Sequence, residues 1–296
     1  MSGTMTNNGL NCLLERAYYS ASTKTAPTYG IIGAGTTTPT ISDTNLSKPL
    51  PSSATTINAC DAVGAWSQGG DGGAPVQNTT SGEHKEGTAC LNLPTTHSTG
   101  SSTWSLTIAG TDLSSQYIYV WYYISDASAL LTDAADTVRL TLGTGGFVNV
   151  NYYDTDYDNI TDGWNLLVFK CSSYSSQGGS GATLSNVDRI RITVKNSASC
   201  TTNNQRMDYW HYASETVQRV SLTSGYPQFN TGAKTVTTRA AFESNLYNTG
   251  AYVVSETGLR NADNSWVLFS RDTLTQTINK TSKVRIVMTW VETISQ

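Results

Sequence analysis

Only 14% of the 296 residues are charged, and the formal net charge is −4. Soluble domains typically contain about 25% charged residues, so this surface is solvated mainly by hydroxyl and amide groups. The sequence has no Lys/Arg cluster of the kind that neutralises phosphates, which argues against a nucleic-acid partner. No apolar run reaches the roughly 18 residues of a membrane span, and the first residues lack the features of a signal peptide. We therefore expect a protein that is made in a cytosol and is not inserted into a membrane.

The first sixty residues predict one helix followed by an extended arm. Residues 6–20 carry apolar side chains at helical spacing behind an Asn/Thr start that can cap a helix. Residues 22–58 are rich in Thr, Ser, Gly and Pro, which is typical of an arm with short strands. Within the arm, residues 30–36 imitate a dinucleotide-binding turn, but the third glycine is missing and residues 36–39 cannot readily open a helix. We therefore expect no nucleotide cofactor.

Residues 59–216 contain a succession of strand patterns. Residues 189–195 alternate strictly, with Ile190, Ile192 and Val194 on one face, as a half-buried antiparallel strand does. Residues 117–124 and 164–171 are apolar on both faces, which is typical of central strands. Turn-forming clusters separate these runs at the intervals of a β-sandwich. We predict an all-β chain with an antiparallel sandwich in its middle.

Four short motifs follow one another in this middle region. They are Cys-Asp-Ala-Val-Gly-Ala-Trp at 60–66, Glu-Gly-Thr-Ala-Cys-Leu at 86–91, Gly-Trp-Asn at 163–165 and Met-Asp-Tyr-Trp at 207–210. Their order resembles that of the jelly-roll carbohydrate-binding modules. The resemblance implies a structural calcium ion held at Asp61, Glu86 and Asp208. Fold resemblance alone does not establish sugar binding.

A second group of carboxylates could form a calcium loop. Asp154, Asp156 and Asp158 stand at alternate positions, as ligands do in loops that surround a hard cation. However, Asn159 replaces the usual glycine, and Asn165 stands where a bidentate Glu is expected. A solvated hairpin turn rich in Asp and Asn is the favoured interpretation.

Aromatic rings near turns and strand ends are candidates for stacking on sugars, because Trp and Tyr present a broad apolar face with a polar edge. The candidates for a host surface glycan are Trp104, Tyr152, Tyr153, Tyr157 and Trp210. We expect most of the seven tryptophans to lie in the core instead.

The cysteines and histidines show no catalytic or metal-binding spacing. Cys60, Cys90, Cys171 and Cys200 all lie in the middle region, and no pair has the Cys-x-x-Cys spacing. Either two disulfides form after release from a reducing cytosol, or the thiols are buried as small apolar groups. None of the three histidines lies in a nucleophile elbow or a His-x-x-x-His pair, so we expect a protein that is not an enzyme.

The last part of the chain carries another set of motifs. Residues 250–290 contain Glu-Thr-Gly-Leu at 256–259, Ser-Arg-Asp at 270–272, Lys-Thr at 280–281 and a final alternating strand. With the segment 29–50, this pattern resembles structural proteins of tailed-phage particles. The resemblance implies that residues 1–56 and 223–296 form the two parts of one anchoring β module. The jelly roll, residues 57–222, is then an insertion.

The resemblance implies a structural component on the surface of a virion that is assembled in the host cytoplasm. We expect a capsid decoration or head-fibre protein bound to the major capsid protein. The alternatives are a tail or baseplate component bound to tail subunits, a glycan-binding adhesin, and a polysaccharide-active enzyme. Threefold association is usual in proteins of this resemblance, which implies a homotrimer. In the final strand, Val284, Ile286, Met288 and Trp290 share one face, whereas Val287 and Val291 make the opposite face apolar too.

Overall fold

The structure is a computed structural model. It describes residues 4–6, 26–96, 100–132, 134–197, 204–233, 235–247, 251–261 and 268–293. The predicted helix over residues 6–20 lies outside these ranges except for Thr6. In the part of the chain that is described, no helix is long and apolar enough to cross a membrane.

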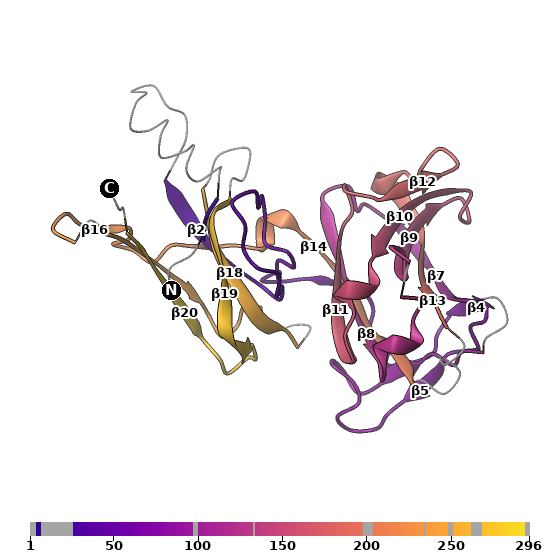
Figure 1. Cartoon of the computed structure of the whole chain (residues 1–296). Coiled ribbons are helices and arrows are strands. Elements are labelled where there is room, and N and C mark those ends of the chain that lie inside the picture. The colour runs from indigo at the N-terminus through magenta and orange to yellow at the C-terminus, as the bar shows by residue number, and fades with distance from the viewer. Residues whose placement is uncertain are drawn as a thin grey trace. The chain divides into compact units, whose positions relative to one another are not determined.

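The chain forms two compact units (Figure 1). Met1–Ser53 and Thr216–Gln296 make one, which we call the end unit because it contains both ends of the chain. Ala54–Glu215 makes the other, which we call the sandwich unit. The sandwich unit is therefore inserted into the end unit through two chain connections.

The sandwich unit consists of two antiparallel sheets, as the alternating patterns predict. The first sheet has the order β11 (Gly163–Lys170), β8 (Gln116–Ile124), β14 (Gln205–Ser214), β6 (Cys90–Asn92) and β5 (Val76–Asn78), with β3 (Thr55–Asn58) also paired to β14. The second has the order β12 (Ser176–Gly178), β10 (Asn149–Thr155), β9 (Val138–Thr144), β13 (Val187–Lys195), β7 (Ser101–Thr111) and β4 (Ser67–Gly70). Short 3-10 turns occur at η1 (Ala127–Ala129), η2 (Tyr157–Asn159), η3 (Leu184–Asn186) and η5 (Glu215–Val217).

The core of the sandwich lies between the facing sides of these sheets. On β13, Ile190, Ile192 and Val194 are buried and the residues between them are half-buried, which confirms the predicted alternation. β8 is buried on both faces along almost its whole length, as predicted for a central strand. Its inward residues at 118, 120, 122 and 124 belong to the same apolar core as β13.

The end unit combines strands from both ends of the chain. Its larger sheet has the order β1 (Thr4–Met5), β19 (Leu268–Asn279), β18 (Val253–Asn261), β2 (Pro27–Gly33) and β15 (Val220–Ser221). A three-stranded sheet contains β16 (Gln228–Asn230), β17 (Thr235–Phe242) and β20 (Ile286–Thr293). Because β2 pairs with β18 over most of its length, the first and last parts of the chain share one ladder.

The two sheets of the end unit pack against each other at Gly30 of β2. A Cβ atom at this position would collide with Ala240, and Phe242 and Trp290 also lie within contact distance. The alternation predicted for the last strand is confirmed from Ile286 to Trp290, whereas Val284 lies before β20 begins. On the opposite face of β20, Val287 is 37% exposed and Val291 is 39% exposed.

Excision of residues 54–215 is expected to give a domain that folds alone, because its sheets and core are contained within that range. The excised domain should unfold in one cooperative transition, measured by circular dichroism and by near-ultraviolet signals from its tryptophans. A domain that stays disordered while the full-length chain folds would show that the end unit is required for its folding.

Candidate functional site

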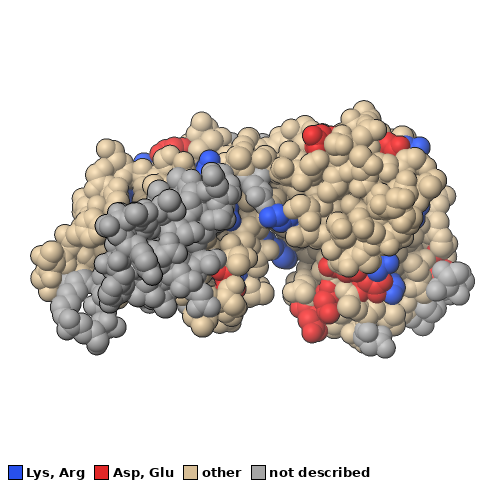
Figure 2. Space-filling view, turned by 90° about the horizontal axis from the view of Figure 1, so that it is seen from above, with Lys and Arg blue, Asp and Glu red and all other residues tan. Residues whose placement is uncertain are grey.

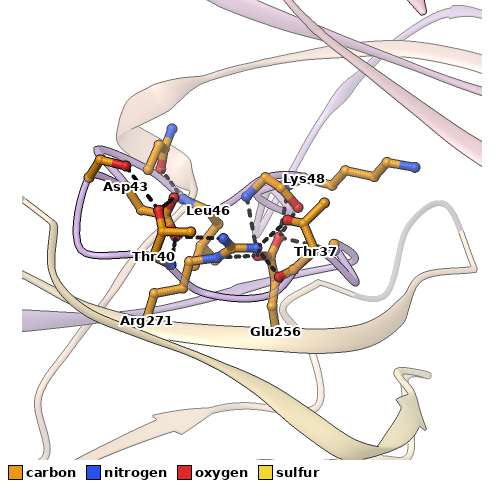
Figure 3. A network of polar contacts seen from close by, with 11 residues as sticks. Thr37, Thr40, Asp43, Leu46, Lys48, Glu256 and Arg271 are labelled. Atoms are coloured by element: carbon orange, nitrogen blue, oxygen red, sulfur yellow. Dashed lines mark hydrogen bonds and ion pairs between the residues drawn. The ribbon is translucent and has the colours of Figure 1, made fainter. Parts of the chain in front are cut away.

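A buried polar network in the end unit contains residues from the arm and from β18 and β19 (Figure 3). Its centre is Glu256 of β18, which is fully buried. One carboxylate oxygen, Oε1, accepts hydrogen bonds from the backbone N–H groups of Gly35 at 3.0 Å and Lys48 at 2.8 Å. The other, Oε2, accepts one from the N–H of Ser47 at 3.1 Å. The side chain of Glu256 thus binds the arm at residue 35 and again at residues 47 and 48, on both sides of the loop formed by residues 36–46.

Arg271 of β19 supplies the positive charge of the network. Its Nε lies 2.9 Å and its Nη2 2.8 Å from Oε2 of Glu256. Its Nη1 lies 2.6 Å from Asp43, and its Nη2 also donates to the carbonyl of Thr37 at 3.0 Å. Asp43 in turn accepts hydrogen bonds from the N–H and the hydroxyl of Thr40. The guanidinium group therefore joins β18, β19 and the loop of the arm.

The glycines of the arm are explained by this network. A Cβ atom at Gly33 or at Gly35 would collide with the carboxylate of Glu256, so the close approach of backbone and carboxylate requires residues without side chains. The glycine pattern that imitates a dinucleotide-binding turn consequently has a packing function. β2 continues into the arm at this point, and no helix follows in the described chain.

The charges of the network stabilise one another. Burial alone would raise the pKa of Asp43, but hydrogen bonds from Thr40 and Arg271 hold it below its ordinary value. Burial alone would lower the pKa of Arg271, but its contacts with Asp43 and Glu256 raise it above its ordinary value. Burial lowers the pKa of Lys48, and the charge of Glu256 opposes this change.

The hydrogen bonds leave Glu256 little capacity to act as a catalytic base. Each of its oxygens accepts three hydrogen bonds or ionic contacts, which exceeds the roughly two lone-pair sites per oxygen of a carboxylate. Buried ion pairs that are fully hydrogen-bonded have mainly a structural role, because removal of one partner leaves an uncompensated charge. The network therefore attaches residues 34–48 of the arm to β18 and β19.

Of the three predicted calcium ligands, Asp61 and Asp208 both contact the loop before β6, residues 85–89, which contains the third ligand, Glu86. Oδ1 of Asp61 accepts the N–H groups of Thr88 at 2.6 Å and Ala89 at 2.9 Å. Oδ2 of Asp208 accepts the N–H groups of Lys85 at 2.7 Å and Glu86 at 3.0 Å. Glu86, the third predicted ligand, thus meets Asp208 through its backbone. Both Asp residues fold residues 85–89 into a loop.

The fit of this loop to a calcium ion is partial. In the described part of the chain, no three acidic, histidine or cysteine side chains are grouped as metal ligands. However, Oδ1 of the fully buried Asp208 has no hydrogen-bond partner among the described residues. Burial raises the pKa of Asp208 to about 6, although the N–H groups of Glu86 and Lys85 lower it. An unpaired carboxylate oxygen of this kind is what a hard cation would bind.

Calcium binding at Asp208 remains a prediction with a direct test. Calcium that binds only the folded sandwich is expected to raise the melting temperature of the metal-stripped protein, and Asp208→Asn is expected to remove this response. Differential scanning calorimetry with and without calcium measures both effects. An unchanged melting temperature at saturating calcium would exclude the site.

The other acidic cluster serves local structure. Asp154 forms an ion pair with Arg139 at 2.6 Å. Asp156 caps η2 by accepting the N–H of Asp158 at 3.1 Å. These contacts support the favoured interpretation of a turn stabilised by Asp side chains. Calcium coordination by Asp154, Asp156 and Asp158 receives no support from them.

Three of the five predicted glycan-binding rings are core residues, so that prediction is wrong for them. Trp104 and Trp210 are fully buried, and Tyr153 is 2% exposed. A ring must have an exposed face to stack on a sugar, and core packing removes that face. Tyr152 is half-buried under the guanidinium of Arg139 at 4.7 Å, and the half-buried Tyr157 packs against the core.

The outward face of the first sheet carries an aromatic pair that is absent from the residues predicted above. Tyr123 of β8 and Trp164 of β11 are half-buried cross-strand neighbours, with ring centroids 5.3 Å apart. Arg206 of β14 lies over the ring of Tyr123 at 4.6 Å and forms an ion pair with Glu83 at 2.9 Å. The signal was available, because positions 117, 119, 121 and 123 are all aromatic.

The thiols and the histidine of the sandwich are buried. Cys60, Cys90 and Cys171 are free, so these three form no disulfide with one another, whereas Cys200 lies outside the described residues. Burial raises the pKa of Cys171 to about 12, which keeps this thiol protonated and unreactive. His211 is fully buried and stacks on Tyr119 with ring centroids 5.0 Å apart.

No protein-family model matches the chain, and no curated protein matches it. Solved structures are similar to part of it, and three of them are described here. An exo-β-agarase is 11% identical with a TM-score of 0.37, and the match covers 55% of this chain and 25% of that one. A structure of carbohydrate-binding modules from the β-sandwich superfamily is 11% identical with a TM-score of 0.35, covering 56% of this chain and 64% of that one. An arabinose-bound α-L-arabinofuranosidase is 10% identical with a TM-score of 0.33, covering 63% and 26%. The chain therefore spans less than two thirds of each of these proteins.

Proposed function

We propose that this chain is a structural component of a tailed-phage virion, located on the capsid surface as a decoration or head-fibre protein. The end unit attaches the chain to the particle, and the sandwich unit is the part it displays. One observation carries the proposal: the Glu256–Arg271 network joins the arm near the N-terminus to two strands near the C-terminus. Because this network joins the two parts of the end unit, the sandwich unit can be inserted between them while the end unit stays one compact unit.

The motifs behind the resemblance to phage structural proteins lie in this network. Glu256 opens the Glu-Thr-Gly-Leu motif, and Arg271 is the centre of the Ser-Arg-Asp motif. Residues 34–48, which both side chains hold, belong to the segment that resembles the beginning of such proteins. The motifs therefore contain the residues that hold the arm to β18 and β19, which supports a role of the end unit in attachment.

The end unit is proposed to form a homotrimer through residues 1–52 and 225–296. Val287 and Val291 leave an apolar outer face on β20, and in the described part of the chain only β17 pairs with this strand. Cyclic symmetry would cover three such faces at once. Analytical ultracentrifugation of the full-length protein should give a trimer. A protein that is monomeric at high concentration, and present as single copies on particles, would refute this arrangement.

Purified particles test the virion assignment. Mass spectrometry of density-purified particles should detect this chain, and imaging of intact particles should place it in repeated copies on the capsid. A chain that stays in the soluble fraction would refute the proposal, and density at the tail would favour the tail or baseplate alternative. Add-back to particles that lack the chain provides a second measurement. Deletion of residues 1–20 should weaken binding more than any substitution in the sandwich unit.

An adhesin that binds a host surface glycan is the second candidate function. The half-buried rings of Tyr123 and Trp164, with Arg206 beside them, are the observation that favours it. Aromatic faces next to planar polar groups suit sugar rings, which have apolar faces and polar edges. Binding to a glycan array that is lost in Trp164→Ala would support this role.

A further inference from the structure

The sandwich unit has an open groove of about 440 Å³ that none of the functions above uses. One wall is β3, residues 55–58, and the other is the second half of β7 from Leu106 to Thr111. Tyr212 of β14 and Ala65 complete the lining. The volume lies within the roughly 300–1,000 Å³ of typical ligand sites.

Both walls of the groove are strand edges without a neighbouring strand. β3 pairs with β14 through residues 55, 56 and 58, and no other described strand pairs with it. On the groove side of β7, β4 pairs only with residues 102–105. The remaining residues of β7 pair with β13 on the opposite side alone, as far as the structure describes the chain. The groove is therefore bordered by the hydrogen-bonding edges of two different sheets.

Natural proteins shield exposed strand edges with charged side chains, prolines or bulges. The pairing register shifts at residue 57 of β3 and between residues 107 and 111 of β7, but charged side chains and prolines are absent from both edges. Residues 55–58 are Thr-Thr-Ile-Asn and residues 106–111 are Leu-Thr-Ile-Ala-Gly-Thr, with no charge and no proline. Thr and Ile are among the residues that favour strands. The composition of the edges is thus suited to pairing with another strand.

The floor of the groove is apolar and continuous with the core. Ile57, Ile108 and Tyr212 are partly buried and pack against the core of the sandwich, and Leu106 belongs to that core. The exposed rim carries the hydroxyl groups of Thr55, Thr56 and Thr107. No lining residue is charged, so the groove has no group to pair with a charged ligand. Figure 2 shows that uncharged residues also form most of the visible surface.

We propose that this groove binds an extended, uncharged segment of a partner protein as an added β-strand. The main chain of the segment pairs with an edge of β3 or β7, and every second side chain lies on the apolar floor, which is the alternation of a strand. An oligosaccharide is a poorer fit, because Tyr212 is the only aromatic ring in the lining. The site is independent of the proposed virion role and would give the sandwich unit a contact of its own.

A labelled peptide with the sequence of residues 105–111, Ser-Leu-Thr-Ile-Ala-Gly-Thr, is the probe, because it is uncharged and compatible with a sheet of this domain. Fluorescence polarisation with the full-length protein should show saturable binding. N-methylation of alternate peptide amides removes main-chain donors and should weaken binding roughly tenfold or more. Because the protein is unchanged in this comparison, the result does not depend on the folding of a variant.

Protein variants locate the binding to the groove. Ile108→Lys introduces a charge on the floor and should also weaken binding roughly tenfold or more, whereas Val148→Lys, at a position that is 70% exposed, should leave it unchanged. Melting temperatures show whether both variants fold. Absence of binding, equal binding of the N-methylated peptide, or equal binding by Ile108→Lys would overturn the proposal. Binding of a neutral oligosaccharide that Ile108→Lys abolishes, without peptide binding, would also overturn it.

Discussion

Glu256→Gln is expected to destabilise the end unit by about 3–5 kcal/mol, the range found when one partner of a buried ion pair is removed. Gln keeps the size of the side chain but places an amide group among hydrogen-bond donors from Gly35, Ser47, Lys48 and Arg271. Arg271 then retains only Asp43 as a charged partner. Urea denaturation followed by circular dichroism measures the loss.

Proteolysis shows whether the arm detaches in this variant. With the carboxylate gone, residues 34–48 lose their charged acceptor on β18, so thermolysin should cleave before the buried Leu46 faster than in the wild-type protein. Cleavage is followed by mass spectrometry under native conditions. The arm should remain protected in any variant that leaves Glu256 and Arg271 intact.

The matched control is the exposed ion pair between Glu243 and Arg285 in the same unit. Its side chains are 49% and 53% exposed, and the distance between their charged atoms is 2.9 Å, as short as in the buried pair. Exposed pairs contribute at most about 1 kcal/mol, so Glu243→Gln should have a small effect. Equal effects of the two substitutions, with the arm protected in both, would show that the network does not hold the arm.

In the variant Asp208→Asn, the free energy of unfolding of the sandwich unit is expected to fall by about 2–3 kcal/mol as the pH is lowered from 7 to 4. The carboxyl group of Asp208 no longer titrates in this variant, so the effect of His211 on stability is no longer offset. Burial lowers the pKa of His211 to about 4, from an ordinary value of 6.5. The folded state therefore binds the proton less readily than the unfolded state. Stability is lost as the pH falls from 6.5 towards 4.

In the wild-type protein, Asp208 should largely offset this loss. Burial raises the pKa of Asp208 to about 6, above its ordinary 3.8, so the folded state binds the proton more readily. This contribution increases stability as the pH falls from 6 towards 4, again by about 2–3 kcal/mol. The wild-type protein should accordingly show a nearly flat profile over the same range.

Urea denaturation of the metal-free protein at pH 7, 5 and 4 tests the opposed titrations. His211→Phe keeps an aromatic ring beside Tyr119 and should give a sandwich that becomes more stable on acidification. Asp208→Asn should show the reverse slope. Parallel profiles for the wild-type protein and both variants would mean that neither group has the pKa given above.

The β architecture was largely predictable because strand patterns depend on near neighbours. The alternation at residues 189–195 and 286–290 reflects which side of a strand faces the core, and the structure confirms both. The continuous apolar run at 117–124 likewise identified a strand buried on both faces. The same local information failed for Trp104 and Trp210. Proximity to a turn does not indicate whether a ring points inward or outward.

The amino-acid sequence by itself determined the fold class, because charge content, turn residues and two-residue periodicity are local properties of the chain. Only the tertiary structure decided the candidate site. Glu256 and Lys48 are 208 residues apart, and the paired edge of β2 and β18 brings them together. The edges that border the groove are likewise a consequence of which strands pair and where β4 ends. Contacts between distant residues depend on the packing of whole sheets, and local patterns do not encode that packing.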